Sequence, residues 1–196
     1  FCPTHAIHFA DRTCGEWFVS ETRSGPMVHA CLGIATENSG KLVSTVRNQA
    51  RVTAASKGSG SILIDGPPGI GCPVIAAVTG ATGVLVVTEP TVSGAHDMER
   101  VLELTAHFRI PTAVCINRWD INPEGTEQIE ARARDLDTFI AGRIRYDDAV
   151  TRAQVEGRTV VELGGTAAVD IRGVWKDVRR WMEGSHRAGP SREGSN

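Results

Sequence analysis

Short apolar runs alternate with stretches of helical periodicity over most of this 196-residue chain. Three of the runs, at residues 62–64, 84–87 and 112–116, are too continuously apolar for a strand with one solvated face. Such runs are typical of parallel strands that are covered on both faces. Residues 138–144 form a fourth and weaker run. The pattern therefore predicts a parallel sheet in the region after residue 60.

Segments before, between and after these runs carry apolar residues at spacings of three and four, which predicts helices. The predicted helices cover residues 39–55, 73–79, 93–108, 122–136, 148–155 and 167–182. Ser93 is the expected N-cap of the third helix, and Asn122 followed by Pro123 marks the start of the fourth. In the last helix, Trp175 and Trp181 fall on the apolar stripe, so we expect both to be packed.

Two short strands are predicted before the parallel region, at residues 16–20 and 27–32, with a turn between them. Residues 159–161 are expected to be extended. The alternation of strands and helices after residue 60 predicts a doubly wound α/β fold, with a mostly parallel sheet, helices on both faces and right-handed crossovers.

The composition is that of an ordinary globular protein, with 41% apolar and 22% charged residues. The net charge of −2 offers no basic surface for nucleic acid. No apolar run approaches the roughly 20 residues that cross a bilayer, and no signal peptide is recognisable. These features predict a cytoplasmic protein with no nucleic-acid partner and no membrane span. The first residue is Phe rather than Met, which is typical of a fragment or a processed form.

One candidate site follows the first apolar run, where Asp65 precedes a turn of Gly66, Pro67, Pro68 and Gly69. In open parallel sheets, ligands bind beyond the carboxyl ends of the strands. A carboxylate there can hold Mg²⁺ through water while the metal bridges phosphate oxygens. Glycines let the backbone approach a phosphate closely. We expect Asp65 to be the catalytic and metal-binding residue and the turn to contact a nucleotide; the alternative is a simple helix cap.

The phosphate-binding half of such a site is not in the sequence. A phosphate-binding loop has the pattern G-x-x-x-x-G-K-[ST]. Residues 57–61 place their lysine before the glycines and lead into a strand rather than a helix. No G-x-G-x-x-G follows a strand either, which weighs against a dinucleotide-dependent enzyme. The chain is thus expected to contain the metal side of a nucleotide site without a phosphate cradle.

A second candidate position, Asn117, follows the apolar run at residues 112–116. A side-chain amide at this strand end can hydrogen-bond the edge of a nucleobase. The alternative is a strand-to-helix turn stabilised by the same side chain. Because Asn117 accompanies Asp65 on a neighbouring strand of the predicted sheet, the base contact is the preferred interpretation.

The five cysteines contain no C-x-x-C pair, which indicates neither a disulfide framework nor a self-contained metal site. Cys115 falls within an apolar run and is expected to be a core residue. Cys2 is followed by proline, like the last cysteine of a bacterial ferredoxin run, which ligates a different cluster from its neighbours. A single cysteine cannot hold a cluster by itself.

Six segments of the chain together resemble one family. They are residues 1–7 (FCPTHAI), 15–20 (GEWFVS), 38–43 (NSGKLV), 63–74 (LIDGPPGIGCPV), 88–94 (TEPTVSG) and 115–118 (CINR). In this order they are similar to the MinD/ParA-superfamily P-loop ATPases that carry an inserted ferredoxin domain. The resemblance runs from Phe1 to about Met182, and the DGPPG and TEPT strings are its most specific parts.

The resemblance implies a P-loop NTPase fold that is incomplete, because the family's Walker A strand, loop and helix have no counterpart here. It implies ATP and Mg²⁺ as ligands, with Asp65 as the Walker B aspartate and residues 66–69 as the switch turn near the γ-phosphate. It also implies that Asn117 contacts adenine. Tyr146 and Asp147 match a family segment near the base, in which Arg145 replaces a proline.

The resemblance further implies a domain layout. Residues 1–9 correspond to the end of a ferredoxin-like insert, in which Cys2 is the final ligand of a [4Fe–4S] cluster. Residues 10–183 correspond to the C-terminal part of the ATPase domain. Residues 184–196, rich in Gly, Ser, Arg and Glu, are expected to be a disordered tail. Dimers are typical of the superfamily, so a homodimer and an iron–sulfur or electron-transfer partner are expected for the full-length protein.

The leading functional hypothesis is the C-terminal portion of an ATPase coupled to an iron–sulfur module, acting in cluster or metallocofactor assembly or in electron transfer. The alternative is a non-catalytic binding or regulatory module, or a truncated remnant. By itself the chain is expected neither to bind ATP tightly nor to hydrolyse it. Because the Walker A strand that normally lies beside it is absent, the expected strand at residues 62–64 would keep an unpaired apolar edge.

Overall fold

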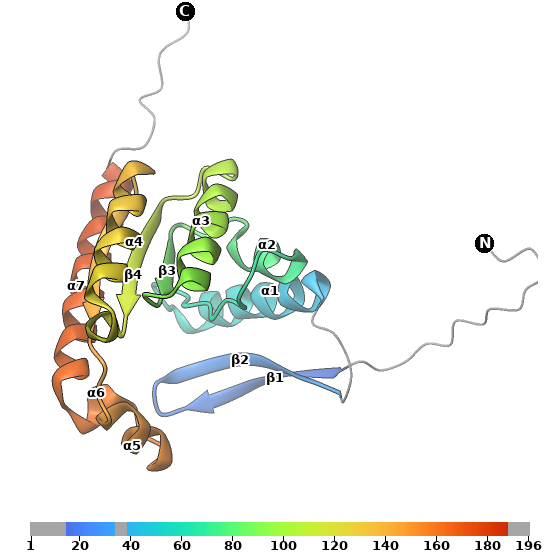
Figure 1. Cartoon of the computed structure of the whole chain (residues 1–196). Coiled ribbons are helices and arrows are strands. Elements are labelled where there is room, and N and C mark those ends of the chain that lie inside the picture. Colours follow the sequence, from blue (N-terminus) through green and yellow to red (C-terminus); the bar gives the residue numbers. More distant parts are fainter. Residues whose placement is uncertain (1–14, 34–38, 188–196) are drawn as a thin grey trace, which may run out of the picture. The chain divides into compact units, whose positions relative to one another are not determined.

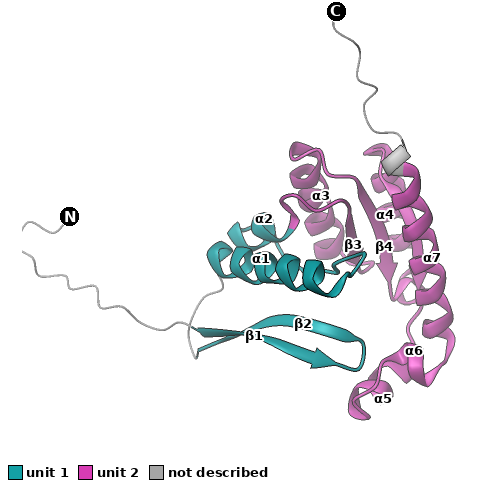
Figure 2. Ribbon diagram, turned by 180° about the vertical axis from the view of Figure 1, so that it is seen from behind, with its two compact units in different colours: residues 1–77 teal, residues 78–196 magenta. Residues whose placement is uncertain are grey.

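The computed structural model describes residues 15–33 and 39–187. The chain divides into two compact units, Phe1–Ala77 and Val78–Asn196 (Figure 2). The first unit contains a hairpin and a long helix. The second contains a parallel sheet with its helices (Figure 1).

The hairpin of the first unit pairs β1 (Gly15–Thr22) with β2 (Gly25–Leu32) in antiparallel register. Helix α1 (Gly40–Lys57) contacts β2. The helix begins at Ser39, whose side chain accepts a hydrogen bond from the Leu42 amide, and ends at Gly58 in a left-handed conformation. These two features are ordinary start and stop signals of a helix. The predicted strand pair and the predicted helix over residues 39–55 are both confirmed.

The prediction of a strand at residues 62–64 is wrong for the described structure. This segment has no regular secondary structure and pairs with no described strand. Leu63 is 88% exposed and Ile62 is 42% exposed. A parallel strand is stable only when a neighbour satisfies its backbone groups, and no described strand does so here. Helix α2 (Cys72–Val78) follows, close to its predicted position.

The sheet of the second unit is parallel, with the strand order β3-β4-β5. Its strands are β3 (Val84–Thr88), β4 (Thr112–Asn117) and β5 (Phe139–Ile144). A register shift in the β4–β5 pairing accompanies Gly142, which has a φ of 138° that only glycine adopts readily. All three strands were predicted from their apolar runs.

Helices cover both faces of this sheet, which confirms the predicted α/β class. The helices of the second unit are α3 (Val92–His107), α4 (Pro123–Asp135), α5 (Ala149–Val155), α6 (Val160–Leu163) and α7 (Thr166–Arg187), with the 3-10 turn η1 (Trp119–Ile121). On one face, α3 and α4 pack on β4 through Met98, Leu102, Val114, Ile116, Ile129 and Ala133. On the other, α7 packs through Val174 and Val178 on Ala113, Cys115 and Ala141.

Local capping explains two differences from the predicted boundaries. Helix α3 begins after Thr91, not Ser93, because the Thr91 hydroxyl accepts the hydrogen bond of the Gly94 amide. Residues 159–161 are not extended, because Thr159 and Glu162 form a reciprocal capping box that starts α6.

Two further differences concern α7. Trp181 packs as predicted, with its ring stacked on Phe139 at 6.0 Å between centroids. Trp175 is 53% exposed, because it lies one position beyond the buried stripe of Val174 and Val178. The helix continues to Arg187, so residues 184–187, assigned to the tail from the sequence, are helical. Residues 1–14 and 188–196, with Cys2 and the rest of the tail, lie outside the described residues.

Candidate functional site

The carboxyl ends of β3, β4 and β5 lie at one edge of the parallel sheet. The register places Thr88 beside Ile116, and Asn117 beside Ile144. The residues that follow these ends, Glu89 and Tyr146 among them, therefore gather with Asn117 at the edge where α/β folds bind ligands.

Three side chains from two of these strand ends contact one another. Asn117 Nδ2 donates a hydrogen bond to Glu89 Oε1 at 3.4 Å, and Arg118 Nη1 lies 3.4 Å from the same oxygen. The Arg118 guanidinium also lies over the ring of Tyr146, 5.9 Å from its centroid. Arg118 has a positive φ of 53°, so the chain turns sharply after β4. Ends of all three strands are thus joined through Arg118.

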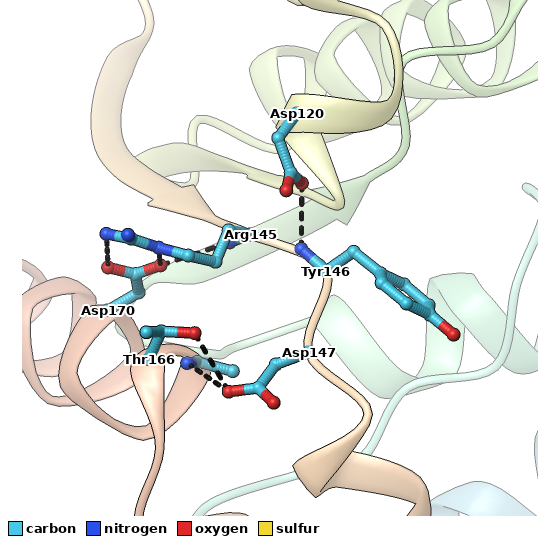
Figure 3. Close-up of polar contacts among 7 residues, drawn as sticks. Asp120, Arg145, Tyr146, Asp147, Thr166 and Asp170 are labelled. Carbon is cyan, nitrogen blue, oxygen red and sulfur yellow. Dashed lines mark hydrogen bonds and ion pairs between the residues drawn. The ribbon is translucent and has the colours of Figure 1, made fainter.

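Asp120 links the end of β4 to the end of β5. Its Oδ1 accepts a hydrogen bond from the Tyr146 amide at 2.8 Å. The Tyr146 side chain is 51% exposed, and its ring points away from Arg145 and Asp170 (Figure 3). A hydrogen bond with Asp148 is the main cause that raises the pKa of the Tyr146 hydroxyl. The backbone of Tyr146 is therefore fixed, while its ring is about half exposed and lies against the Arg118 guanidinium.

Arg145, which replaces the proline of the resembling family, has a partner on α7. Its Nε and Nη2 donate to the two carboxylate oxygens of Asp170 at 2.7 and 2.9 Å, and its amide donates to Oδ2 at 3.1 Å (Figure 3). This bidentate geometry is the strong form of an arginine–carboxylate pair. Hydrogen bonding to Arg145 lowers the pKa of Asp170. The pair ties the end of β5 to α7.

Asp147 binds the start of α7 with the same carboxylate that the sequence assigned to nucleotide binding. Its Oδ2 accepts from the Thr166 hydroxyl at 2.9 Å and from the Ala167 amide at 3.0 Å, and its Oδ1 accepts from the Ala149 amide at 2.8 Å. The close approach requires Gly165, where a Cβ would lie 2.8 Å from Oδ2. These hydrogen bonds, the Ala149 amide first, lower the pKa of Asp147 to about 2.

The other sequence-predicted position, Asp65, belongs to the first unit and has a different environment. It is exposed, and it forms no hydrogen bond or ion pair with any described residue. Gly69, at the end of the same turn, has a φ of 88° that favours glycine. An unpaired carboxylate beside a glycine turn fits a hydrated Mg²⁺ ion, which is bound through one or two carboxylates and keeps several waters.

An iron–sulfur cluster finds no ligand set in residues 15–33 and 39–187. No group of three or more His, Cys, Asp or Glu in this part of the chain could hold a metal ion. Cys31 and Cys72 are exposed, and Cys115 is buried, as expected for a core residue. Burial raises the pKa of the Cys115 thiol to about 12.

Of the helices within residues 15–33 and 39–187, none has the length and apolarity that crossing a membrane requires.

No model of a known protein family matches the chain. It is similar to two uncharacterized proteins of Methanocaldococcus jannaschii. MJ0578 is 32% identical over 97 residues, which cover 50% of this chain and 34% of that protein. MJ0579 is 22% identical over 176 residues, which cover 90% of this chain and 58% of that protein. The chain therefore spans about a third of the length of MJ0578 and somewhat over half of the length of MJ0579.

Solved structures with a similar fold are MinD proteins. The MinD cell division protein of Aquifex aeolicus aligns with a TM-score of 0.55 and 26% identity, over 76% of this chain and 63% of that one. MinD of Pyrococcus horikoshii, solved with Mg-ADP, aligns with a TM-score of 0.58 and 19% identity, over 72% and 57%. The chain shares the fold of the aligned part of these MinD proteins.

A third MinD structure, the MinC:MinD complex of A. aeolicus, covers 91% of this chain and 69% of that one, with a TM-score of 0.57 and 22% identity. The matches confirm the predicted incomplete P-loop fold and the MinD side of the resemblance. They contain no finding on an inserted ferredoxin domain.

The residues that make contacts around the strand ends form what we call the strand-end cluster: Glu89, Asn117, Arg118, Asp120, Arg145, Tyr146, Asp147 and Asp170. Sequence reasoning assigned no role to three of them. Glu89 and Arg118 were only parts of the TEPT and CINR strings, and Asp170 was not singled out, because its partner is a distant arginine. The signal for Glu89 was its position directly after an apolar parallel strand, the same argument that selected Asp65 and Asn117.

Proposed function

We propose that the chain supplies the base-binding side and the metal side of the nucleotide site of a MinD-type P-loop ATPase that uses ATP and Mg²⁺. The observation that carries this proposal is the convergence of Glu89, Asn117, Arg118 and Tyr146 at the carboxyl edge of a sheet with the MinD fold. Partly exposed polar groups and an exposed aromatic ring at such an edge suit a flat heterocycle.

The proposed roles follow from what each group offers. Asn117 hydrogen-bonds the edge of adenine, and Tyr146 stacks on its face. Asp147 holds the loop that carries Tyr146 against α7 and borders the base. Asp65 binds Mg²⁺ through water and is the catalytic carboxylate. Gly66, Pro67, Pro68 and Gly69 form the turn that responds to the terminal phosphate.

The proposal includes an iron–sulfur module. Residues 1–9 would be the end of a ferredoxin-like domain, residues 10–183 the C-terminal part of the ATPase domain, and the residues after it a tail. Cys2 would be one ligand of a [4Fe–4S] cluster, which needs further cysteines from outside this sequence. The full-length protein would act in the cytoplasm as a homodimer, in cluster or metallocofactor assembly or in electron transfer with an iron–sulfur partner.

A second candidate function is a non-catalytic binding or regulatory module. The observation in its favour is that two carboxylates near the strand ends are engaged in structural contacts: Asp147 binds the starts of α5 and α7, and Asp170 binds Arg145. In addition, no sequence motif of this chain can cradle phosphates. In a longer protein with a phosphate loop, Asp65→Ala separates the two functions. An ATPase loses Mg-dependent hydrolysis on this substitution, whereas unchanged turnover would overturn the catalytic assignment.

The base site can be tested on the chain itself by titrating adenosine and following the backbone amide NMR signals of Glu89, Thr91 and residues 117–120. The expected Kd is roughly 1 mM, about −4 kcal/mol. Asn117→Ala should weaken binding about fivefold or more, because it removes a pair of hydrogen bonds. Gln154→Ala, at an exposed position on α5, is the matched control. Shifts that avoid the strand ends, or that survive Asn117→Ala, would contradict the proposed base site.

A further inference from the structure

Glu89 lies in the turn between β3 and α3, and its backbone position is closely fixed. Its carbonyl accepts a hydrogen bond from the Thr91 amide at 2.8 Å. A Cβ at Gly94 would lie 2.4 Å from the same carbonyl oxygen, so only glycine fits at that place. The Glu89 side chain therefore leaves the end of β3 from a defined point and reaches the end of β4.

The Glu89 carboxylate fixes the orientation of the Asn117 amide. An ionised carboxylate only accepts hydrogen bonds, and the Arg118 guanidinium, a donor, lies 3.4 Å from the same oxygen. The Asn117 group that faces Glu89 must therefore be the NH₂ group, as the 3.4 Å contact to Nδ2 shows. The reverse orientation would place two acceptors against each other.

This orientation leaves one acceptor and one donor of Asn117 for a ligand. Oδ1 accepts no hydrogen bond from any described residue, and Nδ2 retains a second N–H. An acceptor beside a donor is the pattern that an asparagine uses against the N6 amino group and N7 of adenine. Guanine and hypoxanthine present two acceptors there, O6 and N7, so one of their atoms would face Oδ1 unfavourably.

We propose that Glu89 is a positioning residue that sets the base preference of the site. By holding the Asn117 amide with its nitrogen toward β3, it selects a purine with an amino group at position 6 over a purine with a carbonyl group at that position. The inference rests on the proposed base contact of Asn117, and goes beyond it by naming the residue that determines selectivity.

The test compares adenosine with inosine, which differ at position 6 of the purine. The 196-residue chain should bind adenosine roughly tenfold more tightly than inosine, within the range of a two-point base contact. Glu89→Gln has a side-chain amide that can donate as well as accept, so the Asn117 amide is free to turn over. The ratio of the two affinities should then fall to about twofold. Glu103→Gln, at an exposed position on α3, should leave the ratio unchanged.

A second readout needs no nucleoside. In the ligand-free chain, one side-chain amide proton of Asn117 should resonate downfield because it donates to the Glu89 carboxylate. Glu89→Gln should move this signal upfield, and Glu103→Gln should not. If the side-chain amide shift of Asn117 is the same in Glu89→Gln as in the wild type, the positioning role is overturned, even if adenosine binds.

The outcomes separate the two proposals. Adenosine binding without a preference over inosine, or a preference that survives Glu89→Gln, overturns the inference and leaves the proposed base site intact. A chain that binds neither nucleoside overturns the proposed function and the base preference together. In that case the Asn117 amide signal still reports whether Glu89 orients the side chain.

Discussion

The strand-end cluster of the second unit and the Asp65 turn of the first unit both follow apolar segments, yet they differ in how their side chains are held. Asn117, Tyr146 and Asp147 have hydrogen-bond or cation–π partners from neighbouring elements. Asp65 has no partner among the described residues, and the segment before it pairs with no strand. The residues proposed for the base side are thus held in place by described contacts, whereas the carboxylate proposed for the metal side is not.

The largest expected effect is a difference in the free energy of unfolding between a substitution in the core of the second unit and one next to Asp65. Met98→Ala removes a side chain that is 1% exposed in the core of the second unit, and should lower the free energy of unfolding by about 3 kcal/mol. Leu63→Ala, next to Asp65, removes a side chain that is 88% exposed and should change it by less than about 0.5 kcal/mol. Urea unfolding measures both. Equal losses would mean that the 62–64 segment is packed after all.

A smaller effect is expected at the tie between β5 and α7. Arg145→Ala leaves Asp170, whose side chain is 12% exposed, without its bidentate partner. Because Arg145 itself is 45% exposed, the expected loss of stability is smaller than that of Met98→Ala, but larger than that of breaking a pair in which both side chains are exposed. Arg180→Ala breaks an exposed pair with Asp177 and should cost less than about 0.3 kcal/mol. Thermal unfolding that ranks the two variants in the opposite order would contradict a tie at this point.

Asp147 predicts a pH dependence. Its folded-state pKa of about 2 lies below the ordinary value of 3.8, so its contribution to stability is fully present above about pH 4. It is lost as the pH falls through about 2, where the folded carboxylate is protonated. The stability difference between the wild type and Asp147→Asn should therefore shrink on acidification. The urea midpoints of both proteins, measured from neutral pH downward, give this difference. A stability difference that stays constant with pH would refute the role of the Asp147 carboxylate in holding the start of α7.

The smallest expected effect is at Asp65. Asp65→Ala should leave both the unfolding midpoint and the adenosine affinity of this chain unchanged, because the carboxylate contacts no described residue. A circular dichroism melt and an adenosine titration measure the two quantities. A clear shift in either would show that the Asp65 turn is already engaged within this chain.

The fold of the second unit could be predicted because each of its strands is an apolar run and each long helix has a periodic stripe. The failures were local or depended on partners. Thr159 starts a helix because Glu162 completes its cap, and residues 62–64 lack the neighbour that their pattern requires. The buried Glu130, held by Arg134 and Arg143, had no signal in the linear pattern.

The sequence predicted the strand end at Asn117, but not the contacts made there. Asn117 and Asp65 stand out because they follow apolar runs, a rule that uses sequence order alone. The link from Glu89 to Asn117 joins residues 28 positions apart, and the link from Asp147 to Ala167 joins residues 20 apart. Such contacts are set by strand order and register, which the sequence does not state.

The most direct test of the central claim compares the affinities of adenosine, ADP and Mg-ATP for the 196-residue chain by equilibrium dialysis. A chain that holds the base side without a phosphate cradle should bind all three within about threefold, near the roughly millimolar Kd expected for the base alone. Phosphates bound by a complete P-loop would instead lower the Kd by orders of magnitude. Micromolar binding of Mg-ATP, lost in Asp65→Ala, would contradict the account.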